Sequence, residues 1–247
     1  MRNLDVTRVL GRPVPRIALS LVLAAGIAAC GHDGSTSPSD ATPLVLENLG
    51  VDIAAYDPGT SLAGGVFLQP WVPKAFGEFG QPVLDQNGNR KPLPTFDFVI
   101  PDNVAIVSAI AGVVTKIFNQ GGDYEILIAP NRNSAWFVSL DHVSKLQVAE
   151  GQSVSVGQAV AYGAPYPDNF VWAGKHLAFF EFMIVNHQSS QASCPIDYLD
   201  ASLKDAYRAK ITRLMQDVEP FIKTDIGHYD VGAMVEPGCL AHTVSAS

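Results

Sequence analysis

Short apolar runs punctuated by glycine, between residues 96 and 185, constrain the fold of this chain more than any other feature. The run "VAIVSAIAGVVTKIF" is rich in Val and Ile and is interrupted at Gly112, and "YEILIAP" and "AWFVSLDHV" follow it. Gly151 and Gly157 then separate further short runs that carry valine. This strand length and turn spacing predict a compact, mostly antiparallel β-barrel or sandwich. A helical interpretation fails because glycine recurs too often.

One helix is expected near the C-terminus. Within "SLKDAYRAKITRLMQDVEPFIK", the apolar residues that recur every three or four positions are Leu203, Tyr207, Ile211, Leu214, Val218 and Phe221. This period predicts an amphipathic helix that packs on the β-structure, with Ser202 and Asp205 placed as in a capping box. A helix that binds a partner is the alternative, and nothing else in the sequence supports it.

The first 29 residues are typical of an export signal. Four arginines precede the apolar run "IALSLVLAAGIAAC", which is too short to span a bilayer stably. The run ends on "GIAAC", which resembles the bacterial lipobox, and the resemblance implies that Cys30 is lipidated and anchors the protein in the cell envelope. His32 favours the outer membrane by resemblance to the enterobacterial sorting rule. The alternative is a secretory peptide cleaved near Ala29.

Composition and charge indicate how the rest of the chain is organised and exclude one class of function. Residues 30–43 are small, polar and rich in Pro and Gly, which predicts a flexible tether. Residues 44–92 are irregular and predict an N-terminal extension, with a hairpin turn at Asn87-Gly88. The net charge of −8 becomes more negative once the basic signal is removed. Because nucleic-acid binding needs clustered Lys and Arg, that class of function is excluded.

Two cysteines remain if Cys30 carries lipid. In an oxidising compartment, Cys194 and Cys239 form an even pair that predicts a disulfide. It would tie down the tail formed by residues 200–247 and stabilise the fold by about 3–4 kcal/mol. A catalytic thiol is the alternative, without a second motif to support it.

An ordered series of motifs lies between residues 93 and 199. Asp97 is followed by "PDNVAIVSAIAGVV", and then come "VSLDHVSKL", "VAEGQSVSVGQAVAYG", "HLAFFEFMI" and "CPIDYL". This series resembles the M23 (LytM-type) peptidases, zinc endopeptidases that cut peptidoglycan cross-bridges. The resemblance implies a mainly β fold, the compact barrel or sandwich of a duplicated hybrid motif, with a groove for substrate.

Two of the three zinc ligands of that family are not retained here. The family holds zinc with a His four positions before the Asp, with that Asp, and with the second His of "HxH"; a fourth position stays open for water. The first position is Leu93 in this chain, and the third is Ala178, or Phe179 if the match is anchored on Glu181. Of these three positions only Asp97 can bind metal, so we expect no zinc cofactor.

His142 and His176 match the family's two non-ligand histidines, which stabilise the oxyanion and orient the water. They are the residual catalytic candidates of this chain, although without zinc they have no obvious hydrolytic task and would line a groove as polar residues. A rearranged weak metal site built from Asp97, His142 and His176 is an alternative. Ser139, Asp141 and His142 are not expected to form a triad, because adjacent residues of a strand point to opposite faces.

Together these features predict a cell-envelope lipoprotein with a degenerate, non-catalytic M23-like domain. Its expected partners are peptidoglycan or an envelope protein such as an amidase, with the membrane reached through the lipid. Two alternatives stay open. One is a divergent zinc metalloendopeptidase acting on peptidoglycan, and the other is a structural or adaptor β-barrel.

Overall fold

The computed structural model describes residues 44–68, 76–85, 87–165, 171–172, 174–221 and 228–246. The predicted signal peptide, the tether and Cys30 lie outside these residues. Within them, no helix combines the length and the apolar character needed to cross a membrane.

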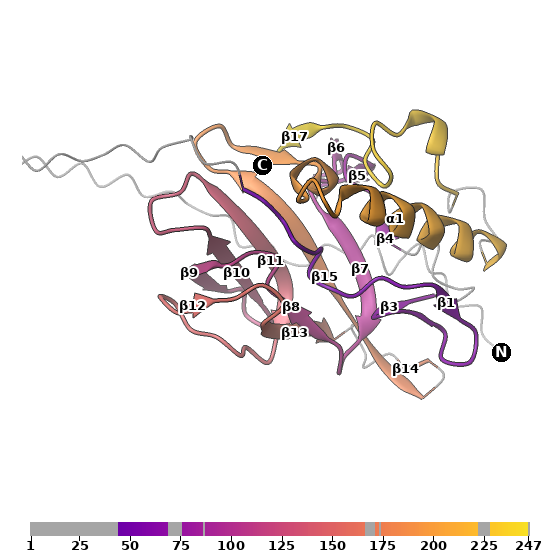
Figure 1. The fold of residues 1–247 in the computed structure, drawn as a ribbon, viewed down its shortest axis with the longest axis horizontal. Coiled ribbons are helices and arrows are strands. Elements are labelled where there is room, and N and C mark those ends of the chain that lie inside the picture. The colour runs from indigo at the N-terminus through magenta and orange to yellow at the C-terminus, as the bar shows by residue number, and fades with distance from the viewer. Residues whose placement is uncertain are drawn as a thin grey trace, which may run out of the picture.

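The central element is β15 (Lys175–Asn186), the longest strand, which runs through the middle of the molecule (Figure 1). It pairs antiparallel with β7 (Phe96–Pro101) on one side and with β11 (Trp136–Ser144) on the other. The remaining strands of this sheet are β4 (Phe76–Gly77), β8 (Ala105–Val107), β9 (Gly112–Asn119), β10 (Tyr124–Ala129), β12 (Ser153–Val154), β13 (Ala159–Pro165), β14 (Val171–Trp172), β16 (Gln191–Ser193) and β17 (Thr243–Ser245).

Two small sheets complete the β-structure. Strands β1 (Tyr56–Asp57), β2 (Leu62–Ala63) and β3 (Val66–Phe67) form one of them, and β5 (Pro82–Leu84) and β6 (Arg90–Pro92) form the other. Gly88 has a φ of 80° between β5 and β6, which confirms the turn predicted at Asn87-Gly88. The mainly β prediction is confirmed, and the open sheets are consistent with a sandwich. The described strands do not close, so a barrel is not confirmed.

The two faces of β15 have different environments because side chains alternate along a strand. Phe180, Phe182 and Ile184 are fully buried in the main core. Glu181 and its neighbours two residues away face the other side and are only partly buried. The first face stabilises the fold, at about 1.5–3 kcal/mol for each large side chain. The second is available for chemistry.

One core joins the segments that the sequence divides into extension, β-domain and tail. Leu46 and Leu49 of the extension lie in the same cluster as Phe98 of β7 and Leu214 of the helix. The backbone of Leu46 also bridges to Leu199. These segments therefore depend on one another for stability.

The helix α1 (Lys204–Val218) is the one α-helix among the described residues, as predicted, and it lies on the β7 side of β15 (Figure 1). Its buried stripe is Ile211, Leu214, Met215 and Val218. The predicted capping box is wrong: the N-cap is Leu203, and Ser202 Oγ donates to Asp200 Oδ1 at 2.5 Å instead. Three short 3-10 helices, Pro195–Tyr198, Glu219–Phe221 and Val231–Ala233, lie near α1 in the chain.

The disulfide between Cys194 and Cys239 is present, with the two Cα atoms 6.0 Å apart. Both cysteines are fully buried in the main core. The bond joins the end of the sheet to the tail across 45 residues and confirms the predicted pairing. It holds the last residues close to β16, where β17 pairs.

Candidate functional site

Three carboxylates stand in a row across the middle of the sheet. Glu181 on β15 lies directly opposite Asp97 on β7 and directly opposite Asp141 on β11. Like charges that face each other on adjacent strands destabilise a sheet. Such a row needs partners that offset the charges, and the candidate site is built around it.

A bulge in β11 adds a histidine to this row. Tyr124 of β10 pairs with Val143, but Ile126 pairs with Leu140, so that Glu125 alone faces both Asp141 and His142. His142 has a φ of 54°, which is uncommon for a residue other than glycine.

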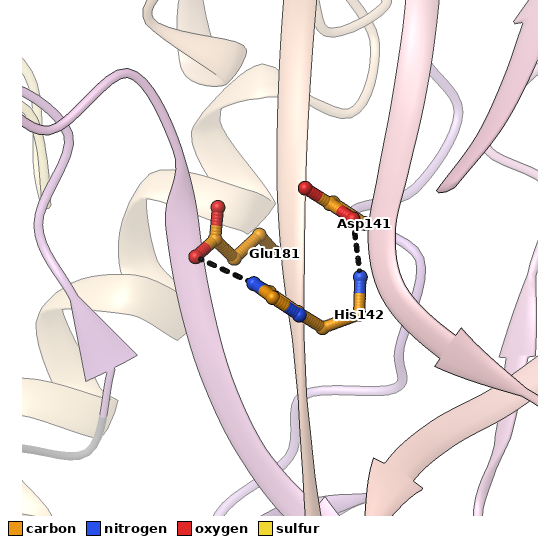
Figure 2. A group of neighbouring side chains, drawn as sticks. All are labelled: Asp141, His142 and Glu181. Atoms are coloured by element: carbon orange, nitrogen blue, oxygen red, sulfur yellow. Dashed lines mark hydrogen bonds and ion pairs between the residues drawn. The ribbon is translucent and has the colours of Figure 1, made fainter. Parts of the chain in front are cut away.

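The bulge changes the direction in which the histidine points. Metal-binding atoms of Asp141, His142 and Glu181 all lie within 4.8 Å of one another (Figure 2). The expectation that Asp141 and His142 point to opposite faces is wrong here, because the ladder is not regular at this position. We call these three residues the His142 cluster.

His142 is held between two acidic side chains. Its Nδ1 lies 2.6 Å from Asp123 Oδ2, its Nε2 lies 3.6 Å from Glu181 Oε1, and its side chain is only 9% exposed. Burial favours the neutral imidazole, but the hydrogen bond with Asp123 and the charges of Glu181, Asp141 and Asp123 outweigh it and raise the pKa of His142 to about 9. At neutral pH this histidine carries a positive charge.

Glu125 completes the acidic surroundings. Ser139 Oγ donates a hydrogen bond to Glu125 Oε1 at 2.7 Å. Burial raises the pKa of Glu125, and the charges of Asp141 and Glu181 raise it further. The hydroxyl of Ser139 is therefore engaged with Glu125.

The residues at the family's zinc positions do not fit a zinc ion. Leu93 is buried, and Asp97 accepts a hydrogen bond from Thr95 Oγ1 at 2.5 Å. Ala178 is fully buried on the core face, so its position is not on the side of Asp97. Phe179 is on that side, and its ring lies 4.7 Å from the ring of His142. Phe179, the position given by the alignment anchored on Glu181, is therefore the one that shares a face with Asp97.

His176 lies apart from the His142 cluster. It is exposed near the start of β15, where its carbonyl oxygen accepts a hydrogen bond from the amide of Asp102 at 2.8 Å. Strand alternation puts its side chain on the face opposite Glu181. The structure therefore does not bring His142 and His176 together, nor does it form the alternative site from Asp97, His142 and His176.

Sequence reasoning missed the acidic partners of His142. Asp123 and Glu125 flank Tyr124 at the beginning of β10, and Asp141 directly precedes His142. The local signal was the carboxylates at the start of β10 and the one next to His142 in β11, the strand that resembles the family's "Y.HL" strand. Their convergence depends on strand register, which the local sequence does not specify.

Comparisons with known proteins give similarities at the level of solved structures. A zinc-containing peptidase from Vibrio cholerae is 17% identical, with a TM-score of 0.35 over 56% of this chain and 37% of that one. The catalytic domain of lysostaphin, an antimicrobial peptidase from Staphylococcus simulans, is 18% identical, with a TM-score of 0.37 over 49% of this chain and 87% of that one. A putative M23 peptidase from Pseudomonas aeruginosa is 17% identical, with a TM-score of 0.30 over 57% of this chain and 48% of that one.

The last of these structures is described as a putative peptidase M23. The chain spans 37% of the length of the Vibrio cholerae peptidase. No family model matches the sequence, and no curated protein matches it.

Proposed function

We propose that the protein is a cell-envelope lipoprotein whose M23-like domain binds peptidoglycan or an envelope protein without cutting it. The observation that carries this proposal is the ring of Phe179, which lies 4.7 Å from the ring of His142 on the face where the family's third zinc ligand would stand. Leu93, buried and apolar, occupies the first ligand position. The peptidoglycan part of the proposal follows from the motif resemblance.

Protonation of His142 also favours binding over hydrolysis. A general base needs an unprotonated nitrogen at neutral pH, and the raised pKa of His142 leaves it charged and hydrogen-bonded to Asp123. Around it the face is rich in carboxylates. Such a face can bind amino and amide groups, which are donors, through charge-assisted hydrogen bonds. Peptides with free amines are ligands of this chemistry.

The anchor is the second part of the proposal. Lipidation of Cys30 would hold the domain near the cell wall, and His32 favours the outer membrane over the inner. An amidase is the expected class of protein partner. Labelling cells with a radioactive fatty acid tests the anchor: the wild-type chain should be labelled and Cys30→Ser should not. Equal labelling of both would contradict it.

Binding to cell walls tests the domain directly. We expect the purified full chain to sediment with peptidoglycan sacculi and to release no soluble muropeptides. Glu181→Arg reverses a charge on the candidate site and should weaken sedimentation, whereas His176→Ala, on the other face, should not. Stoichiometric zinc together with muropeptide release would show that the protein is a peptidase instead.

The divergent metalloendopeptidase is a second candidate function, and the His142 cluster is the observation that favours it. Three potential ligands lie within 4.8 Å of one another, although they are not the family's set. Release of muropeptides that is lost in His142→Ala would establish this function. A structural or adaptor role predicts neither release nor sedimentation.

A further inference from the structure

We propose that Asp141, His142 and Glu181 form a binding site for a divalent transition-metal cation, using residues other than the zinc ligands of the M23 family. The inference goes beyond the proposed function, because it concerns the domain alone and holds whatever the domain binds. Its three donors come from two neighbouring strands, β11 and β15, that are paired directly.

The donor atoms lie near enough to share one ion after a small shift of the side chains. Two ligands of a zinc ion, each about 2.1 Å from it, lie at most about 4.2 Å apart. The donor atoms of the His142 cluster lie within 4.8 Å of one another. Small rotations of the two carboxylate side chains, moving their oxygens by less than about 1 Å, would bring all three into coordination distance.

The histidine is oriented as a metal ligand requires. Metal-binding histidines almost always donate their second ring nitrogen to a carboxylate or a carbonyl oxygen, which fixes the ring. Here Nδ1 of His142 is bonded to Asp123 Oδ2 at 2.6 Å, and Nε2 faces Glu181 Oε1 at 3.6 Å. Asp123 would thus be a positioning residue that does not touch the ion. The metal would displace the proton on Nε2.

Burial and charge point to a cation in the same place. The side chains of His142 and Glu181 are 9% and 12% exposed, and Asp123 is 17% exposed. Asp141 and Glu125 add two further carboxylates around one histidine. Carboxylates held together away from water repel one another; in the metal-free chain the protonated His142 offsets part of that repulsion, and a bound dication would offset more of it.

The donor set indicates the kind of ion. Two carboxylates and one imidazole suit Zn²⁺ or Mn²⁺, whereas Ca²⁺ and Mg²⁺ prefer oxygen ligands throughout. The site differs from the family's zinc site because Leu93 and Phe179 occupy two of those ligand positions. Asp97, the one retained family ligand, is not part of the His142 cluster.

Calorimetric titration of the full chain with ZnCl₂ and with MnCl₂, after chelator treatment and at pH 8, tests the site. We expect one equivalent of metal to bind the wild-type protein. His142→Ala and Glu181→Gln should each weaken binding by at least about 10-fold, and Asp123→Asn should weaken it by about 10- to 100-fold. CaCl₂ should not compete.

The control variants separate this site from surface histidines. His242 lies 2.8 Å from Asp197 and is exposed, so His242→Ala removes another His-carboxylate pair, and His176→Ala removes the lone exposed histidine of β15. Neither should change the affinity. Circular dichroism checks each fold, and if His142→Ala does not fold, Glu181→Gln decides the result.

Two outcomes would overturn the proposal. One is no binding by the wild-type chain at millimolar metal, and the other is equal binding by the wild type and Glu181→Gln. Because this titration contains no peptidoglycan, its failure leaves the sedimentation result intact. Conversely, failure to sediment with sacculi leaves the metal titration intact.

Discussion

The two ends of the motif "HLAFFEF" lie on one strand but have different surroundings. His176, at its start, is exposed on the segment of β15 that pairs with the short strand β14, which projects from the body of the molecule (Figure 1). Glu181, five residues further, lies between β7 and β11, and each of these strands brings a carboxylate against it. Glu181 therefore has side-chain partners because the strands on both sides of it supply them. The histidine of the motif, His176, lies on another part of the strand, away from them.

The largest contrast between the two ends should be in stability. Phe180 is fully buried, and its ring stacks on that of Phe98 with the centroids 5.4 Å apart. Phe180→Ala should lower the free energy of unfolding by about 3–5 kcal/mol, because it leaves a cavity in the core. Urea unfolding of this variant and of Lys175→Ala, the matched change at the start of the strand, measures the difference. A loss below about 1 kcal/mol for Phe180→Ala would contradict the packing described.

Histidine placed at two adjacent positions tests which face of β15 belongs to the site. Ala178 is fully buried, and a Cβ added to Gly163 would lie 2.9 Å from the Cβ of Ala178, so there is no room for a larger side chain. Ala178→His should cost about 3–4 kcal/mol through overpacking and burial of a polar group. Phe179→His should cost less than half as much, because Phe179 faces the partly exposed side. Equal costs in thermal unfolding would mean that the alternation of faces is wrong.

Much of the fold was accessible from the sequence because it depends on local pattern. The glycine-punctuated runs predicted the strands, the three-to-four residue period predicted α1, and the cysteine count predicted the bond between Cys194 and Cys239. The cap of α1 was not predicted correctly. A capping box at Ser202 needs its Oγ to accept a hydrogen bond from the backbone N–H of Asp205, whereas Ser202 Oγ donates to Asp200 Oδ1 and Leu203 is the N-cap. Where the helix begins depends on the turn that precedes it, which the capping-box pattern alone does not specify.

The candidate site was predicted only in part, because it depends on long-range register. The sequence identified His142 and Asp97 as candidates, but the pairing of Asp141 with Glu181 joins residues 40 positions apart in the chain. The bulge that turns His142 toward Glu181 needs a positive φ at that residue, which nothing in its neighbours signals. The alternation of side chains between the two faces of a strand cannot be extended through such a position, since one extra residue moves the following side chains to the other face.

The pH dependence of stability should separate His142 from the exposed His176. In the folded, metal-free chain the pKa of His142 is about 9, above its ordinary value near 6.5. The proton therefore stabilises the fold by up to about 3 kcal/mol below pH 6.5, and this stabilisation is lost as pH rises through 9.

Urea unfolding with EDTA at several pH values from 6 to 10 measures this loss. His142→Gln, which cannot titrate, should flatten the curve over this interval, and His176→Ala should leave it as in the wild type. A wild-type curve with no fall between pH 7 and pH 9 would mean that His142 is not held by the carboxylates around it.

The smallest effect is expected at the residue that the motif singled out first. His176 is exposed, and the hydrogen bond it makes to Asp102 uses its backbone carbonyl, which a side-chain substitution leaves in place. His176→Ala should therefore change the free energy of unfolding by no more than about 0.5 kcal/mol. Its sedimentation with sacculi should also stay unchanged, because the side chain lies on the face opposite Glu181. If sedimentation were lost in this stable variant, the binding surface would lie at the start of β15, near His176, and not around Glu181 in the middle of the strand.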